Sequence, residues 1–222
     1  MNAKLSILAV LAFAGLSMAA SVVAVAYNLQ LMTYIGESGV AAYGVIEYAA
    51  MLFGAVLGGY VEGAAPLMSY QPGAQNDDEK RSLFVHGLGI VAVGGLAMFA
   101  CSQLLAHPLA FAFTGYDAEL LALAEGAFRT YSVSFLFFGF TMFGPSVFTA
   151  LGNGTVSAII AFVHTIVFEV GSVLLLPTIF GAGSIWWSIT VAEVAATILT
   201  GAFLFALGPR YGLLPMRSTA GE

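Results

Sequence analysis

The hydrophobic positions form six long, nearly uninterrupted runs, separated by short polar segments that contain Gly or Pro. Each run reaches the roughly 20 residues that an α-helix needs to cross the hydrocarbon core of a bilayer. Short connections favour antiparallel neighbours in a single bundle. We therefore predict an all-α, polytopic membrane protein whose six transmembrane helices cover residues 5–34, 40–70, 83–106, 118–148, 156–180 and 185–207.

The first run also has features of a cleavable secretion signal, because Lys4 precedes it and small residues surround Met18. However, the apolar stretch continues to Tyr34, which is long enough to span a bilayer. We interpret it as a retained first membrane helix, with cleavage as the alternative.

Composition supports a membrane protein and excludes several functions. Hydrophobic residues make up 60% of the 222-residue chain and charged residues 8%, whereas soluble domains carry about a quarter charged residues. The absence of a basic stripe argues against nucleic acid as a partner. The single cysteine, Cys101, excludes an intrachain disulfide. Without a nucleophile–base set or a metal-ligand motif, we predict no enzyme activity, no metal site and no cofactor.

The basic residues predict the orientation, because Lys and Arg near the ends of membrane helices favour the cytoplasmic side. No Lys or Arg lies in the connections after the first, third and fifth runs. We predict a multi-pass protein of the cell membrane with both termini in the cytoplasm, a lobe over residues 1–210 and a cytoplasmic tail over 211–222. Five basic residues agree with this orientation: Lys4, Lys80, Arg81, Arg210 and Arg217.

Seven ionisable residues lie inside the predicted helices, where a charge at the bilayer centre costs about 2.5–3.5 kcal/mol. Each of them must therefore face protein, water or an opposite charge. They are Glu47, Glu62, Glu125, Arg129, His164, Glu169 and Glu193.

The depths of four carboxylates predict an acidic cavity that opens to the outside. The helical rise places Glu47, Glu125 and Glu169 in the outer half of the membrane and Glu193 near its middle. Glu47, Glu169 and Glu193 have no basic partner on their own helix. We therefore predict that they bind the coupling ion, H+ or Na+, or line a substrate cavity.

Two further pairs of residues can be interpreted from their spacing. Glu125 and Arg129 stand one turn apart, acid first, which predicts an ion pair that neutralises both charges. His164 and Glu169 stand five apart, so they face different sides of an α-helix and no direct pair is expected. We interpret His164 as a hydrogen-bonded core residue.

Two prolines predict interruptions in the helices. Pro145 and Pro177 lie inside apolar runs, where proline removes a backbone hydrogen bond. Transporters use such breaks where helices line a cavity, and a simple packing kink is the alternative.

The end of the second run resembles a pattern of the multidrug and toxic compound extrusion (MATE) family. Its exit reads P-L-x-S-Y-x-x-G-A-x-N after Glu62 and Gly63, and it contains Pro66, Tyr70, Gly73 and Asn76. Further along, Arg129 precedes the turn SVFTALGNGTVS, and a later Pro-containing helix end is followed by G-x-x-S-I-W. The resemblance covers nearly the entire chain.

The resemblance implies a cation-coupled (H+ or Na+) antiporter that exports amphipathic or cationic compounds through a cavity between two six-helix lobes. This chain is similar to one lobe, the C-terminal one. It departs from the usual pattern at several positions: Glu47 stands where an amide is common, Glu62 replaces a common Gln, His164 stands where Arg is frequent, and Glu169 is unusual.

Two hypotheses for function follow. In the first, the chain is a half-transporter that needs a second lobe, from a homodimer or a partner chain. The lobes of the family are parallel repeats, and an even number of helices gives both copies the same orientation. In the second, the chain is a truncated or inactive membrane subunit. A lipid flippase-like relative is a further alternative, and it predicts a more basic cavity.

Overall fold

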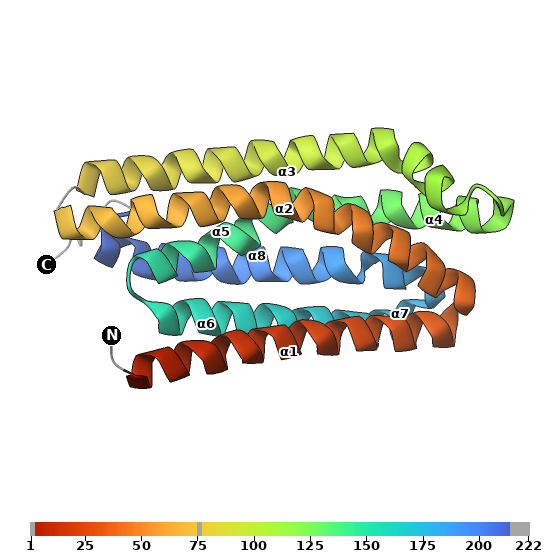
Figure 1. Ribbon diagram of the computed structural model, residues 1–222, viewed down its shortest axis with the longest axis horizontal. Coiled ribbons are helices and arrows are strands. Elements are labelled where there is room, and N and C mark those ends of the chain that lie inside the picture. Colours follow the sequence, from red (N-terminus) through yellow and green to blue (C-terminus); the bar gives the residue numbers. More distant parts are fainter. Residues whose placement is uncertain (1–2, 75–76, 214–222) are drawn as a thin grey trace, which may run out of the picture.

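The structure, a computed structural model, describes the backbone of residues 3–74 and 77–213 and the side chains of residues 19–71 and 77–213. Long helices lie side by side in a single bundle (Figure 1). The first three are α1 (Ala3–Tyr34), α2 (Glu37–Ala74) and α3 (Asp77–Thr114). The remaining spans are built from shorter elements: α4 (Ala118–Tyr131), η1 (Ser132–Ser134) and α5 (Phe135–Ala150); α6 (Gly154–Phe162), η2 (Val163–Glu169) and α7 (Val170–Phe180); η3 (Ala182–Trp187), α8 (Ser188–Leu207) and η4 (Gly208–Tyr211).

This architecture confirms the predicted all-α, polytopic fold. Within the described residues, five continuous helical stretches are long and apolar enough to cross a membrane: Glu37–Gln71, Asp77–Thr114, Ala118–Ala150, Gly154–Phe180 and Ala182–Tyr211. The start of α1 and the end of η4 lie at the same end of the bundle (Figure 1).

Local sequence signals explain where several helices begin and end. Gly36 follows α1 with φ 92°, a left-handed conformation that glycine adopts readily after a helix. The Asp117 carboxylate accepts hydrogen bonds from the backbone N–H groups of Glu119 and Leu120 and so caps α4. Asn153 caps α6 through the N–H of Val156. Short connections therefore suffice to reverse the chain.

Two of the predicted connections are largely helical. α3 continues past its predicted end at residue 106, through Pro108, to Thr114. α2 extends to Ala74, and α3 starts at Asp77. With 38 residues, α3 is about 57 Å long, which exceeds the roughly 30 Å hydrocarbon core. The ends of a helix of this length therefore extend beyond the hydrocarbon core without leaving the helical conformation.

The interruptions of the helices do not lie at the predicted prolines. α5 continues through Pro145, and α7 continues through Pro177. The chain instead tightens into a 3-10 turn at η1, where Gln103 Nε2 donates to the Arg129 carbonyl at 2.9 Å and to Ser132 Oγ at 2.8 Å. A π-helical segment at η2 interrupts the next span. Side chains and altered backbone bonding, rather than proline, cause both breaks.

Small residues let α3 approach α5 closely. A Cβ on Gly95 would lie 2.7 Å from the carbonyl oxygen of Phe135, a distance that requires one backbone to move. A Cβ on Gly144 would similarly meet the Thr200 side chain of α8. This packing holds the middle of the bundle together while many large apolar side chains remain on its surface, as expected for a protein surrounded by lipid.

We expect Gly95→Ala to destabilise the protein by about 1–3 kcal/mol, because overpacking forces the backbones of α3 and α5 apart. The thermal unfolding midpoint of the detergent-purified protein measures this effect. Gly89→Ala is the matched control on the same helix, since Gly89 is exposed and a Cβ there meets nothing within 4 Å. Equal midpoints for the two variants would contradict the close approach.

Candidate functional site

A cavity of about 270 Å³ lies between α1, α2, the α4–α5 junction, η2 and α8. Its lining is mainly apolar but contains three carboxylates, Glu47, Glu169 and Glu193. These are the three carboxylates that the sequence analysis selected by depth, and the fold brings them from three different elements to a single space.

The three carboxylates differ in their exposure. Glu47 is exposed, and its Oε1 accepts a 2.7 Å hydrogen bond from the hydroxyl of Tyr43, one turn earlier on α2. Glu193 is only 2% exposed, and its Oε2 accepts a 2.6 Å hydrogen bond from Thr141 Oγ1 on α5. Glu169 is intermediate. The cavity therefore runs from an accessible carboxylate to one that is sealed inside the bundle.

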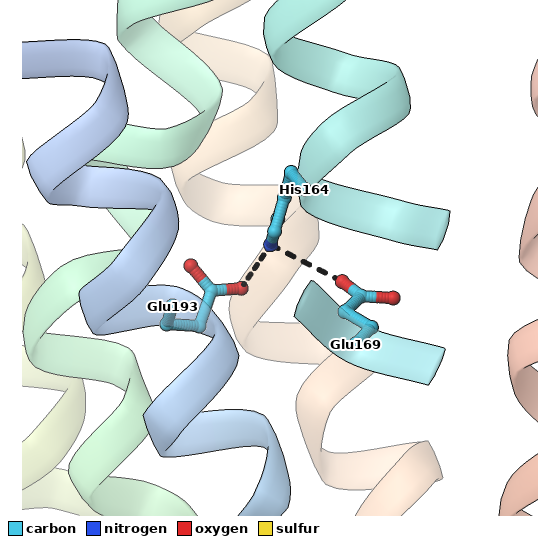
Figure 2. A group of neighbouring side chains, drawn as sticks. All are labelled: His164, Glu169 and Glu193. Atoms are coloured by element: carbon cyan, nitrogen blue, oxygen red, sulfur yellow. Dashed lines mark ion pairs between the residues drawn. The ribbon is translucent and has the colours of Figure 1, made fainter. Parts of the chain in front are cut away.

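His164 lies between Glu169 and Glu193, which corrects the sequence-based interpretation of this residue (Figure 2). Its Nε2 is 3.2 Å from Glu169 Oε1 and 3.4 Å from Glu193 Oε1. In an α-helix, residues five apart point roughly 140° away from each other. Residues 163–169 are π-helical, and the i→i+5 bonding of a π-helix puts residue i+5 above residue i. The local change of helix type thus forms the pair that ordinary helical spacing excluded.

His164 Nε2 is close to both carboxylates but lacks a well-aligned hydrogen bond. This atom is inaccessible to solvent, and among the described residues it has no partner with hydrogen-bond geometry, although both carboxylates lie within ion-pair distance. His164, Glu169 and Glu193 are therefore close enough for ion pairing, but His164 Nε2 is not aligned for a hydrogen bond to either carboxylate.

Three tyrosines also line the cavity, and the sequence analysis did not identify them. Tyr27 and Tyr43 stack with their ring centroids 4.9 Å apart and an interplanar angle of 2°. Tyr131, at the end of α4, contributes to the same lining. The four-residue spacing between Tyr43 and Glu47 was the available signal, because such residues share a helix face.

Glu125 does not join the cavity, so the prediction of four converging carboxylates is wrong for this residue. Its Oε1 accepts hydrogen bonds from Arg129 Nε at 3.1 Å and Nη2 at 3.0 Å, which confirms the predicted ion pair. Its Oε2 lies 2.7 Å from His107 Nδ1. Arg129 also donates to the Gln103 carbonyl at 3.1 Å. His107 was missed because a connection was predicted after residue 106, whereas α3 continues to Thr114.

The residues of the predicted exit motif lie away from this cavity. Glu62, Pro66 and Tyr70 are exposed along α2, and Gly73 belongs to the last turn of that helix. Asn76 lies outside the described residues. Glu62 is not among the lining residues of the acidic cavity.

The fold and the cavity define a multi-pass helical membrane protein with ionisable groups gathered inside an apolar bundle. Residues 6–174 match the family model MatE, and the chain therefore belongs to the MATE family of multidrug transporters, which are not enzymes. No curated protein is similar enough to this chain to match it.

Solved structures of the family share this fold. The chain aligns with an outward-facing multidrug resistance MATE transporter at a TM-score of 0.80 and 22% identity, over 89% of this chain and 46% of that one. An inward-facing MATE transporter gives 0.80 and 22%, over 93% and 47%. A MOP superfamily transporter from Pyrococcus furiosus gives 0.82 and 21%, over 90% and 45%. The chain spans about half the length of these relatives and corresponds to one lobe.

We expect Arg129→Met to lower the thermal unfolding midpoint slightly, because it leaves the partly exposed Glu125 carboxylate without its guanidinium partner, and exposed ion pairs contribute little to stability. The double variant Glu125→Gln/Arg129→Met removes both charges and should recover most of the loss. Fluorescence-detected size-exclusion chromatography after heating measures all three proteins. A double variant no more stable than the single one would contradict the pairing.

Proposed function

We propose that the chain is one lobe of a cation-coupled antiporter that exports amphipathic or cationic small molecules. The supporting observation is the single cavity that carries Glu47, Glu169 and Glu193 inside an apolar bundle. Carboxylates in membrane-spanning helices are costly unless they bind a cation or a proton, and they commonly mark ion and substrate pathways.

The cavity offers chemistry for both exchanged species. Glu193 is almost fully buried and is oriented by Thr141, so it can bind H+ or Na+ away from bulk water. The rings of Tyr27, Tyr43 and Tyr131 can contact the apolar and cationic parts of an organic substrate. A proton or Na+ and a cationic substrate would compete for the same carboxylates. Such competition is the basis of exchange in the proposed mechanism.

The size of the cavity favours a half-transporter. A volume of about 270 Å³ lies just below the 300–1,000 Å³ typical of pockets for small organic ligands. A second lobe, from another copy of this chain or from a partner chain, would enlarge the space and close it on the open side at Glu47. The chain covers 45–47% of its solved relatives, which is the share expected for one of two lobes.

Two alternatives differ from this proposal in definite ways. An inactive membrane subunit would need a separate lobe for any transport. A lipid flippase-like function would require basic groups for anionic headgroups, and the described lining of the cavity contains no Lys or Arg. Charge thus favours export of cations over movement of anionic lipids.

The proposed location is the cell membrane, with both ends of the chain in the cytoplasm. The start of α1 and the end of η4 lie at the same end of the bundle (Figure 1). Lys80, Arg81 and Arg210 lie at that end. This supports a cytoplasmic location for it, because basic residues are in excess on the cytoplasmic side of membrane proteins. Lys80 is buried there and pairs with Asp77.

We expect cells that produce only this chain to accumulate less of a fluorescent cationic dye than cells without it, because two copies would complete the pathway. Dye retention by flow cytometry, with membrane insertion verified by fractionation, makes the comparison. Unchanged retention with inserted protein would exclude the homodimeric exporter and favour the inactive subunit.

We expect Glu193→Gln to abolish ion-driven dye exchange, because the amide keeps the shape of the carboxylate but cannot take up a proton or neutralise Na+. Proteoliposomes with an imposed pH gradient or an imposed Na+ gradient identify the coupling ion of the unmodified protein and then test the variant. Glu62→Gln is the matched control, an equally conservative change of a carboxylate outside the cavity. Intact coupling in Glu193→Gln would remove this residue from the mechanism.

A further inference from the structure

Three potential metal ligands converge at the inner end of the cavity. His164 and Glu169 lie at the two ends of η2, and Glu193 comes from α8 (Figure 2). One ligand atom from each side chain lies within 4.8 Å of the other two. The set combines one imidazole nitrogen with two carboxylates, a mixture of ligand types that transition metals bind in proteins.

The distances match the edges of a tetrahedral coordination sphere. Zinc binds nitrogen and carboxylate oxygen at about 2.0–2.2 Å, so two ligand atoms of a tetrahedral site lie roughly 3.3–3.5 Å apart. His164 Nε2 is 3.2 Å from Glu169 Oε1 and 3.4 Å from Glu193 Oε1. Only the two carboxylate oxygens would need to approach each other to complete the face of a tetrahedron.

The orientation of His164 adds to these distances. Its buried Nε2 points at the gap between the two carboxylates, and it makes no hydrogen bond of acceptable geometry to either one (Figure 2). The nitrogen is thus held at ion-pair distance from both carboxylates without hydrogen-bond geometry to either one. A cation located in the gap would accept the lone pair of this nitrogen and the charges of both carboxylates.

Charge and ligand type select the class of cation. Two carboxylates balance a divalent cation inside the apolar bundle, where uncompensated charge is costly. An imidazole ligand suits Zn²⁺, Ni²⁺ and Co²⁺, whereas Ca²⁺ and Mg²⁺ prefer oxygen ligands throughout. We infer that His164, Glu169 and Glu193 form a binding site for one divalent transition-metal cation of this class.

The surroundings favour an exchangeable ion over a structural one. Thr141 Oγ1 donates to Oε2 of Glu193, the oxygen that does not face His164, and such outer contacts orient metal ligands. Glu169 and Glu193 both line the cavity, so a fourth coordination position faces open space. Three protein ligands and one open position allow ligand exchange. The inference concerns binding alone and does not depend on the proposed transport activity.

The test is titration of the detergent-purified, full-length chain with Zn²⁺ by isothermal calorimetry, in excess Na+ and Mg²⁺. We expect saturable binding of one ion per chain. His164→Ala and Glu193→Gln each remove a ligand, so affinity should fall by more than the about 10–100-fold that loss of an outer contact costs. Glu169→Gln provides a third variant. Size-exclusion profiles and helical circular dichroism identify variants that remain folded.

The matched control is His107→Ala, which removes the other histidine within ion-pair distance of a glutamate in the described residues and leaves η2 intact. This variant should bind like the unmodified protein. Co²⁺ provides a second readout, because a tetrahedral site gives intense visible absorption and a six-coordinate surface site does not. The inference is overturned if the unmodified protein shows no saturable binding, if folded His164→Ala binds equally well, if binding is lost in His107→Ala, or if Co²⁺ is six-coordinate.

Discussion

Charge inside an apolar bundle is the constraint on which this structure depends. Lipid offers no hydration, so each ionisable side chain must find its compensation within the protein. Ionisable side chains of different spans meet in two clusters. One lies inside the bundle and joins His164 to Glu169 and Glu193, and the other joins Glu125 to Arg129 and His107 at partly exposed positions. Each cluster combines residues from two helical spans, so neutralisation of charge also fixes how neighbouring helices pack.

The departures from regular helix serve these clusters and the cavity. The π-helical η2 rotates Glu169 onto the side of His164 and directs both toward Glu193 on α8. The 3-10 turn η1 redirects the chain from α4 to α5, and Gln103 satisfies the Arg129 carbonyl that the turn exposes. Residues at both breaks, Ser134 and Glu169, line the cavity. Irregular backbone thus occurs where it lines a polar space, as membrane proteins require.

Much of the fold and part of the candidate site could be predicted from the sequence. Hydropathy predicted an all-α membrane protein, because a spanning helix needs a long apolar run whatever its neighbours are. The helical rise predicted which carboxylates share a depth, and Glu47, Glu169 and Glu193 do line one cavity. The P-L-x-S-Y motif and its companions predicted the family, which the MatE match confirms.

The remaining features depend on contacts between elements distant in sequence. Depth does not specify which way a side chain faces, so Glu125, which was predicted to share the slab of the other carboxylates, instead points toward His107 on α3. Proline was a poor guide to the breaks: α5 and α7 continue through Pro145 and Pro177, and the 3-10 turn η1 lies where Gln103 of α3 bonds the Arg129 carbonyl. The sequence by itself determined the membrane class and the all-α fold, since these follow from local hydrophobicity. Only the tertiary structure decided the pairing of His164 with two glutamates, because that contact requires a π-helical segment packed against α8.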